Sequence, residues 1–266
     1  SEENLNTLPP SAPPAAHKLV RYILLSRRLT TLNEWLAAYN PKTQCIHGEI
    51  KPIGTWTHRA AHKNPNTGNI IRIQNDPETK EVLWGEKGGW GADYRSLWTV
   101  KPGWKLVGCD AEGIQLRVLA HYMEDEEFTQ ALVSGSSKDE TDVHSLNRKK
   151  LNNSKTICKT RNDAKTFIYS WVLGASAPKT AQVLECSVGD AVVARQNFLD
   201  GYPGLKYVKE EMIPQDVQRG YFIGFDGRLV MCNSNHLMLA GYLQNGEAVI
   251  MKYAMWLARE KLRKEK

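Results

Sequence analysis

A short apolar run that ends in a carboxylate is the feature that most limits how this chain can fold. After the turn signal Pro102-Gly103, residues 104 to 109 read Trp-Lys-Leu-Val-Gly-Cys, and Asp110 follows them. The run is typical of a β-strand, whereas the apolar spacing from there to Met123 is helical. A carboxylate at the end of a buried strand is costly unless it is paired or binds a cation. We therefore expect the order strand, Asp110, helix.

Asp110 alone fits two interpretations. Asp is a preferred N-cap residue, so its side chain would satisfy free N–H groups at the start of the next helix. A carboxylate oxygen is also a ligand that magnesium prefers. The local sequence does not distinguish these interpretations, so the choice between them depends on other residues of the chain.

The other local patterns predict helices mixed with short strands. Residues 1–16 are rich in Pro, Ser and Ala and are expected to form a disordered tail or linker. A helix is predicted over residues 17–39, followed by β-prone runs over 44–73 and a glycine-rich loop at 85–91. The later helical patterns and a hairpin turn lie at residues 160–173, 189–199, 204–217 and 236–263, and at Phe225-Asp226-Gly227-Arg228.

The composition indicates a globular protein with a polyanionic partner. Of 266 residues, 41% are hydrophobic and 24% are charged, and the net charge is +6, which favours nucleic acid or nucleoside phosphates. The five cysteines are odd in number and form no C-x-x-C pair, so they indicate neither a disulfide framework nor a zinc site. No stretch approaches the roughly 18 apolar residues of a membrane span, and no signal peptide is recognised. We expect a cytoplasmic protein with no membrane partner.

Arg161, Lys165 and Tyr169 stand four residues apart and therefore share one face of a predicted helix. That face suits a nucleoside triphosphate, because a guanidinium grips phosphate oxygens bidentately and an ammonium adds a point charge. The ring can lie against the sugar and base, and the helix N-terminus attracts anions. The alternative is a solvated basic face, which is the common fate of Arg and Lys at this spacing.

The segments of the chain, taken in order, resemble the family A (Pol I-like) DNA polymerases, most closely their bacteriophage branch, over residues 17 to 266. The most specific likeness is the fingers helix motif R-x-x-x-K-x-x-x-[FY]-x-x-x-Y-G, which the segment from Arg161 to Gly174 follows with one departure. This resemblance implies that Arg161 and Lys165 bind the triphosphate of a dNTP and that Tyr169 meets its sugar. A Tyr at that position implies that dideoxynucleotides are readily accepted.

Residues 110 to 117, Asp-Ala-Glu-Gly-Ile-Gln-Leu-Arg, resemble the first catalytic motif of the family's palm. The resemblance implies that the Asp110 side chain and the Ala111 backbone carbonyl bind Mg²⁺, with Asp110 as the catalytic carboxylate. His144, in Thr-Asp-Val-His, resembles the histidine that assists with the phosphates.

Three further residues resemble family positions that contact DNA. Arg59, in Gly-Thr-x-Thr-x-Arg, resembles the arginine that contacts the minor groove of the primer-template. His236 and Gln244 resemble residues of the helix that contacts primer and template near the insertion site. A DNA primer-template and a dNTP are therefore the expected partners.

Two positions depart from the family pattern. Gln115 stands where the family usually has the Glu that crowds a ribose 2′-OH, and Leu173 stands where it usually has a Tyr that touches this Glu. Gln keeps the bulk of Glu but loses its charge and its hydrogen bond to the tyrosine. We expect Gln115 at the nucleotide sugar, Leu173 at the DNA, and weaker discrimination against ribonucleotides than the family norm.

The family's second catalytic motif, a His-Asp pair on a hairpin, is missing, because no His in the sequence is followed by Asp. A two-metal reaction needs carboxylates around a metal pair about 3.5 to 4 Å apart, which Asp110 alone cannot supply. By this resemblance we also expect the family's upstream exonuclease domain and most of its thumb to be missing. We therefore expect one piece of a split polymerase, completed by a second polypeptide with the His-Asp motif and working with other phage replication proteins. An exposed apolar edge is expected where that hairpin would pair.

The implied fold is α+β, an incomplete right-hand polymerase with a palm antiparallel sheet and a helical fingers subdomain. Its expected parts are a disordered tail at 1–16, a thumb-base helix at 17–40, the first part of the palm at 41–145, fingers at 146–235 and a returning palm helix at 236–266.

Two other functions stay open. One is a non-catalytic protein that binds primer-template DNA without turnover. The other is a relative of the single-subunit phage RNA polymerases, which share the Asp motif and a Lys/Arg fingers helix. The segment from Gly54 to Arg59 and the run Asp142-Val143-His144 favour the DNA enzyme.

Overall fold

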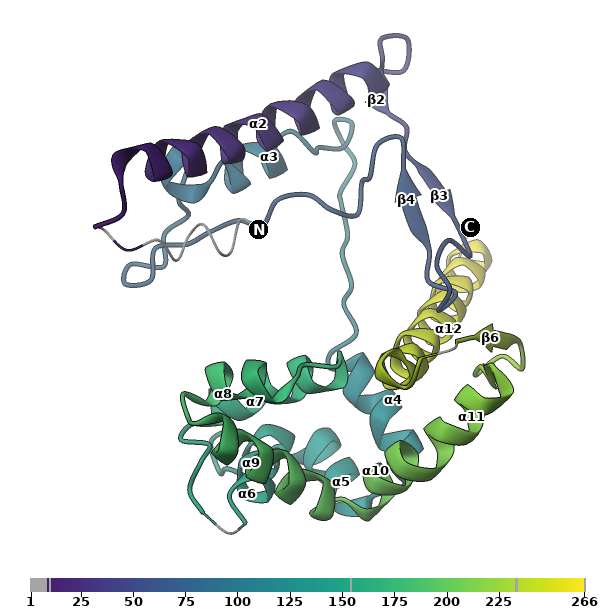
Figure 1. Ribbon diagram of the computed structural model, residues 1–266. Coiled ribbons are helices and arrows are strands. Elements are labelled where there is room, and N and C mark those ends of the chain that lie inside the picture. Colours follow the sequence, from purple (N-terminus) through teal and green to yellow (C-terminus); the bar gives the residue numbers. More distant parts are fainter. Residues whose placement is uncertain (1–8, 10, 154, 233, 266) are drawn as a thin grey trace. The chain divides into compact units, whose positions relative to one another are not determined.

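The computed structural model describes residue 9 and residues 11 to 153, 155 to 232 and 234 to 265 (Figure 1). Most of the predicted tail at 1–16 lies outside these residues. The chain divides into two compact units, one made of Ser1–Pro52 and Ala61–Gly108, the other of Ile53–Ala60 and Cys109–Lys266. No helix in the described part is long and apolar enough to cross a membrane.

The first unit is built on the long helix α2 (Pro14–Ala38), which confirms the helix predicted from residue 17. Trp35 is its buried residue, and its ring lies 5.2 Å from that of Tyr94 in α3 (Gly91–Ser96) and 5.0 Å from that of Trp98. The Tyr94 hydroxyl also donates to the Arg28 carbonyl at 2.6 Å. The unit is completed by β1 (Tyr39–Asn40), β2 (Cys45–Ile46), β3 (Glu49–Lys51), β4 (Ala61–Lys63) and the 3₁₀ turn η1 (Gly85–Gly88).

The second unit is mainly helical and carries the larger core (teal to yellow in Figure 1). Phe198 lies at the centre of an aromatic cluster, with its ring 5.2 Å from Phe167 and 5.1 Å from Tyr202. The elements are α4 (Ile114–Met123), α5 (Glu126–Ser134), α6 (Val143–Leu151), α7 (Arg161–Val172), α8 (Ala177–Leu184), α9 (Val188–Asp200), α10 (Pro203–Tyr207), η2 (Val208–Met212), α11 (Ile213–Arg219), β5 (Tyr221–Ile223), β6 (Leu229–Met231) and α12 (Asn235–Lys264).

Among the described residues the strands form three separate antiparallel pairs, β1 with β2, β3 with β4 and β5 with β6, so the α+β class is confirmed. The turn predicted at 225–228 joins β5 and β6, in which Phe222 pairs with Val230. Four predicted helical patterns correspond to α7, α9, the run from α10 to α11, and α12. Helices α5, α6 and α8 were not predicted from the sequence.

The strand predicted over residues 104 to 109 is wrong. These residues form no regular element, and Trp104, Leu106 and Val107 are 74%, 76% and 86% exposed. Within the described residues, no backbone hydrogen bond involves residues 105 to 111. A strand exists only where a second strand pairs with it, and the apolar run finds none.

Candidate functional site

A polar cleft of about 490 Å³ in the second unit gathers residues from the start of α4, the end of α5, and the N-terminal turns of α6 and α7. Its lining includes five of the residues predicted from the sequence to form a site: Asp110, His144, Arg161, Lys165 and Tyr169.

Helix α7 orients its basic residues by burying the opposite face. Thr160 caps the helix through the backbone N–H of Asp163, and the Asp163 carboxylate accepts from the Thr160 backbone in return. The apolar residues of the helix, namely Ala164, Phe167, Ile168 and Trp171, are buried in the core. Residues at i, i+4 and i+8 on the other side therefore face the cleft together, as the spacing of Arg161, Lys165 and Tyr169 predicts.

Arg161 is held by Asp142, a residue that the sequence analysis did not assign to the site. The Arg161 Nε lies 3.0 Å from both carboxylate oxygens of Asp142, and Nη2 lies 2.6 Å from Oδ2. Asp142 also caps α6, accepting from the His144 backbone N–H at 3.2 Å and from Ser145 Oγ at 2.7 Å. Burial opposes the ionised carboxylate, but the hydrogen bonds from Arg161, Ser145 and His144 hold the pKa of Asp142 well below its usual value.

The sequence contained a signal for this residue. Asp142 precedes an apolar residue that opens a helix, which is the N-cap pattern. Its pairing with Arg161 follows only from the packing of α6 against α7.

His144 lies in the first turn of α6 with only 7% of its surface exposed. Its ring centroid is 6.0 Å from that of Tyr169, and its Nδ1 has no hydrogen-bond partner among the described residues. Burial, followed by the positive charge of Arg161, lowers the pKa of His144 to about 4. The imidazole is therefore neutral at pH 7, and its buried Nδ1 has no partner among the described residues.

Asp110 does not have the environment predicted for it. It is exposed and follows an irregular segment, so it does not end a buried strand. It is not the helix cap either, because Gly113 occupies the N-cap position of α4 and no side chain caps that helix. Among the described residues, no group of three or more His, Cys, Asp or Glu could hold a metal ion.

Another group of predicted residues meets along α12, outside this cleft. Gln115 Nε2 donates to Glu247 Oε2 at 2.9 Å, and Arg59 Nη2 lies 3.4 Å from Glu247 Oε1. Gln244, one turn earlier, accepts from Thr57 Oγ1 at 3.3 Å. Glu247 was not predicted, although it is the only acidic residue between 235 and 259.

His236 and Leu173 lie where the end of α7 meets the start of α12. A Cβ on Gly174 would be 2.6 Å from the His236 ring, so the glycine permits this close approach. Leu173 is the C-cap residue of α7 and is 53% exposed. The predicted residues therefore form three local groups. The first is the cleft. The second, the Glu247 network, consists of Glu247, Gln115 and Arg59 with Gln244 one turn away, and the third is the contact of Gly174 with His236.

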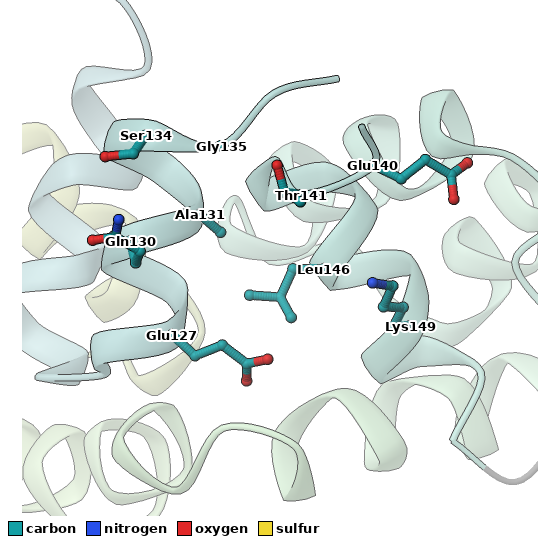
Figure 2. Close-up of a pocket in the computed structure, with 9 residues that line it drawn as sticks. All are labelled: Glu127, Gln130, Ala131, Ser134, Gly135, Glu140, Thr141, Leu146 and Lys149. Atoms are coloured by element: carbon teal, nitrogen blue, oxygen red, sulfur yellow. The ribbon is translucent and has the colours of Figure 1, made fainter. Parts of the chain in front are cut away.

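A second cleft, of about 450 Å³, lies between α5 and α6 and shares Ala131 and Gly135 with the first (Figure 2). Its two carboxylates are already paired, Glu127 with Lys150 at 2.7 Å and Glu140 with Arg148 at 3.1 Å. Paired charges do not require a ligand, so we assign none to this cleft.

Comparison with known proteins places this chain in a described family and fold. The family model described as DNA polymerase family A matches residues 1–266. The DNA-directed DNA polymerases of Enterobacteria phage T3 and Escherichia phage T7 are each 27% identical over 269 residues, covering 92% of this chain and 35% of the relative. DNA polymerase I of Chloroflexus aurantiacus is 28% identical over 219 residues, covering 81% of this chain and 21% of the relative. The match covers 35% of each phage relative, so the chain spans about a third of the length of these proteins.

A solved structure titled "POL domain of Pol1 from M. smegmatis complex with DNA primer-template and dNTP" shares the fold. Its TM-score is 0.69 at 21% sequence identity, and the match covers 94% of this chain and 43% of that chain.

Proposed function

This chain belongs to DNA polymerase family A, and we propose that it supplies the triphosphate-binding part of an enzyme that adds deoxynucleotides to a primer 3′-OH on a DNA template. A second polypeptide carrying a His-Asp motif would supply the second catalytic carboxylate. The observation that carries this proposal is the single cleft lined by Asp110, His144, Arg161, Lys165 and Tyr169.

In this proposal the triphosphate lies along α7. Arg161 uses Nε and Nη2 for Asp142, which leaves its Nη1 edge for a phosphate oxygen. Lys165 adds an exposed ammonium on the same face. The neutral His144 ring presents a nitrogen to the phosphates, and Tyr169 lies against the sugar. Each of these residues recognises the nucleotide before any bond is made.

The primer-template in this proposal runs past the Glu247 network and the start of α12. Arg59, Gln244 and His236 would contact the DNA, and Leu173 would lie beside it. Gln115 would exclude a ribose 2′-OH by its bulk. The named structural neighbour is a polymerase domain in complex with primer-template and dNTP, which supports this choice of partners.

Magnesium is the cofactor that we propose, as in family A DNA polymerases generally. The Asp110 side chain and the Ala111 carbonyl would be its ligands from this chain. When bound, a metal pair activates the 3′-OH and stabilises the charge on the phosphates. No His in the sequence is followed by Asp, so the family's second catalytic motif is not found in it, which is why the proposal includes a second polypeptide.

In this proposal residues 41–145 form the first part of the palm and residues 146–235 form the fingers. The expected setting is the cytoplasm of a host cell, together with other phage replication proteins. The matching family model and the relatives named above are DNA polymerases, which favours this interpretation over an RNA polymerase.

The test is primer extension by the purified chain together with a candidate second polypeptide that carries a His-Asp hairpin. Extension that requires both chains, Mg²⁺ and Asp110 would support the proposal. No extension by the pair, combined with no effect of Asp110→Ala, would refute it.

The second candidate is a non-catalytic DNA-binding protein, favoured by the absence of a three-ligand metal cluster among the described residues. It predicts DNA affinity that falls steeply with salt, but no magnesium-dependent triphosphate binding.

A further inference from the structure

Glu247 joins three segments of the second unit through its two carboxylate oxygens. Oε2 accepts from Gln115 Nε2 of α4 at 2.9 Å, and Oε1 lies 3.4 Å from Arg59 Nη2. The Glu247 side chain is 19% exposed, whereas that of Arg59 is 46% exposed. The shorter, less exposed bond to Gln115 is therefore the stronger of the two contacts, because exposed ion pairs are screened by water and salt.

We propose that Glu247 is a positioning residue that fixes the Gln115 side chain and thereby sets the choice between deoxyribose and ribose. Arg59 in turn orients the Glu247 carboxylate from its other oxygen. This inference rests on the proposed function, since it assigns a sugar-selecting role to Gln115.

The chemistry of the pair fixes the direction of the Gln115 amide. An ionised carboxylate only accepts hydrogen bonds, so the amide nitrogen must face Glu247. Within the described residues, no other hydrogen bond involves the Gln115 side chain. Without Glu247, the Gln115 side chain would regain its rotamer freedom and would exclude a 2′-OH less effectively.

The same geometry favours Gln over Glu at position 115. A Glu there would bring two carboxylates within hydrogen-bond distance, and like charges that close disfavour ionisation of both. Gln115 and Glu247 are therefore a matched pair of donor and acceptor. Exchanging the two residues would restore a donor and an acceptor in the opposite order.

The test compares the affinities of the full chain for dATP and ATP, with Mg²⁺ and a dideoxy-terminated primer-template whose next template base is dT. Four variants are compared with the unsubstituted chain: Glu247→Ala, Gln115→Glu, the exchange Gln115→Glu/Glu247→Gln, and the control Glu260→Ala. Glu260 lies on the same helix, where it pairs only with Arg263 among the described residues. Thermal unfolding of each variant checks that it is folded.

Each single variant of the pair is expected to lower the preference for dATP about 3- to 10-fold, the worth of one hydrogen bond. The exchange variant is expected to recover the preference for dATP to within about twofold of the unsubstituted chain. Glu260→Ala is expected to leave that preference unchanged. A purely structural role predicts equal losses for both nucleotides and no recovery on exchange.

Three outcomes would overturn only the proposed role of Glu247. They are equal losses of affinity for dATP and ATP, no recovery of the dATP preference in the exchange variant, and no preference for dATP in the unsubstituted chain. Failure of the unsubstituted chain to bind any triphosphate would instead overturn the proposed function, and this inference with it.

Discussion

Arg161 and Asp142 form an ion pair that joins the first turn of α7 to the N-cap of α6, with Arg161 Nη2 2.6 Å from Asp142 Oδ2. The pair also fixes which edge of the guanidinium remains free for a ligand. Asp142 is the more buried partner, with 11% of its side chain exposed against 33% for Arg161. The position of the Arg161 guanidinium in the cleft therefore depends on the more buried Asp142 carboxylate.

The first prediction concerns Asp142→Asn. The substitution removes the charge that pairs with Arg161 and weakens the acceptors for Ser145 and the α6 backbone. We expect the free energy of unfolding to fall by about 1 to 3 kcal/mol and affinity for Mg²⁺-dATP to fall as well. The measurements are urea unfolding and calorimetric titration.

The matched control is Glu140→Gln, which breaks an exposed pair with Arg148, with Glu140 57% exposed. It should cost less than about 1 kcal/mol and leave dATP affinity unchanged. Unaltered dATP affinity in Asp142→Asn would show that Asp142 does not orient Arg161.

Local sequence patterns predicted the face of α7 but not the residues that support it. The i, i+4 spacing is a property of the helix, so Arg161, Lys165 and Tyr169 could be assigned to one face from the sequence alone. The Asp142–Arg161 pair and the Gln115–Glu247 bond join residues 19 and 132 positions apart. Such contacts depend on how helices pack, which local periodicity does not report.

The irregular segment at 104–110 shows the same limit for strands. Its apolar alternation is typical of a strand, but the hydrogen bonds of a strand come from a neighbour. No described segment pairs with it, so no strand forms there and Asp110 is exposed. The environment of a carboxylate cannot be predicted when the strand before it depends on a distant partner.

The second prediction is a pH dependence caused by His144. Its pKa is lowered from 6.5 to about 4 in the folded chain, mainly by burial. Between these values the unfolded chain binds more protons, so stability must rise with pH and fall as the solution is acidified. The loss is expected to be on the order of 2 kcal/mol between pH 7 and pH 4.

Unfolding of the unsubstituted chain and of His144→Asn at several pH values measures this effect. The variant should lose less stability than the unsubstituted chain across the window from pH 6.5 to pH 4. Parallel curves for the two proteins would show that His144 is not the group responsible. The depressed pKa of Asp142 contributes only at lower pH, because its stabilisation is lost as pH falls below the ordinary Asp value.

The third prediction concerns Lys165→Ala. Lys165 is exposed on the cleft face of α7, so its removal should cost little stability. If its ammonium binds phosphate, Mg²⁺-dATP affinity should fall about 10-fold or more, the worth of a hydrogen bond between charged groups. Lys159→Ala is the control, because Lys159 is 61% exposed and lies 3.5 Å from Glu185. Equal dATP affinity in the two variants would count against a triphosphate on this face.

The fourth prediction separates backbone strain from a contact at Gly174. Gly174 has a φ of +89°, and a Cβ there would be 2.6 Å from the His236 ring. Gly227 has a similar φ of +79°, but a Cβ there would meet no atom within 4 Å. Replacing either glycine with Ala should cost about 1 to 2 kcal/mol of stability, because an L side chain is strained in the left-handed region.

Only Gly174→Ala should displace His236, which is exposed and therefore free to move. If His236 contacts the primer-template, Gly174→Ala should weaken DNA binding while Gly227→Ala should not. The check is the affinity of both variants for a fluorescent primer-template at fixed salt, since salt alone changes such affinities strongly. Equal DNA affinity in the two variants would mean that the position of His236 does not matter for DNA. A loss of DNA affinity confined to Gly174→Ala would indicate that the end of α7 affects DNA binding through the position of the His236 ring.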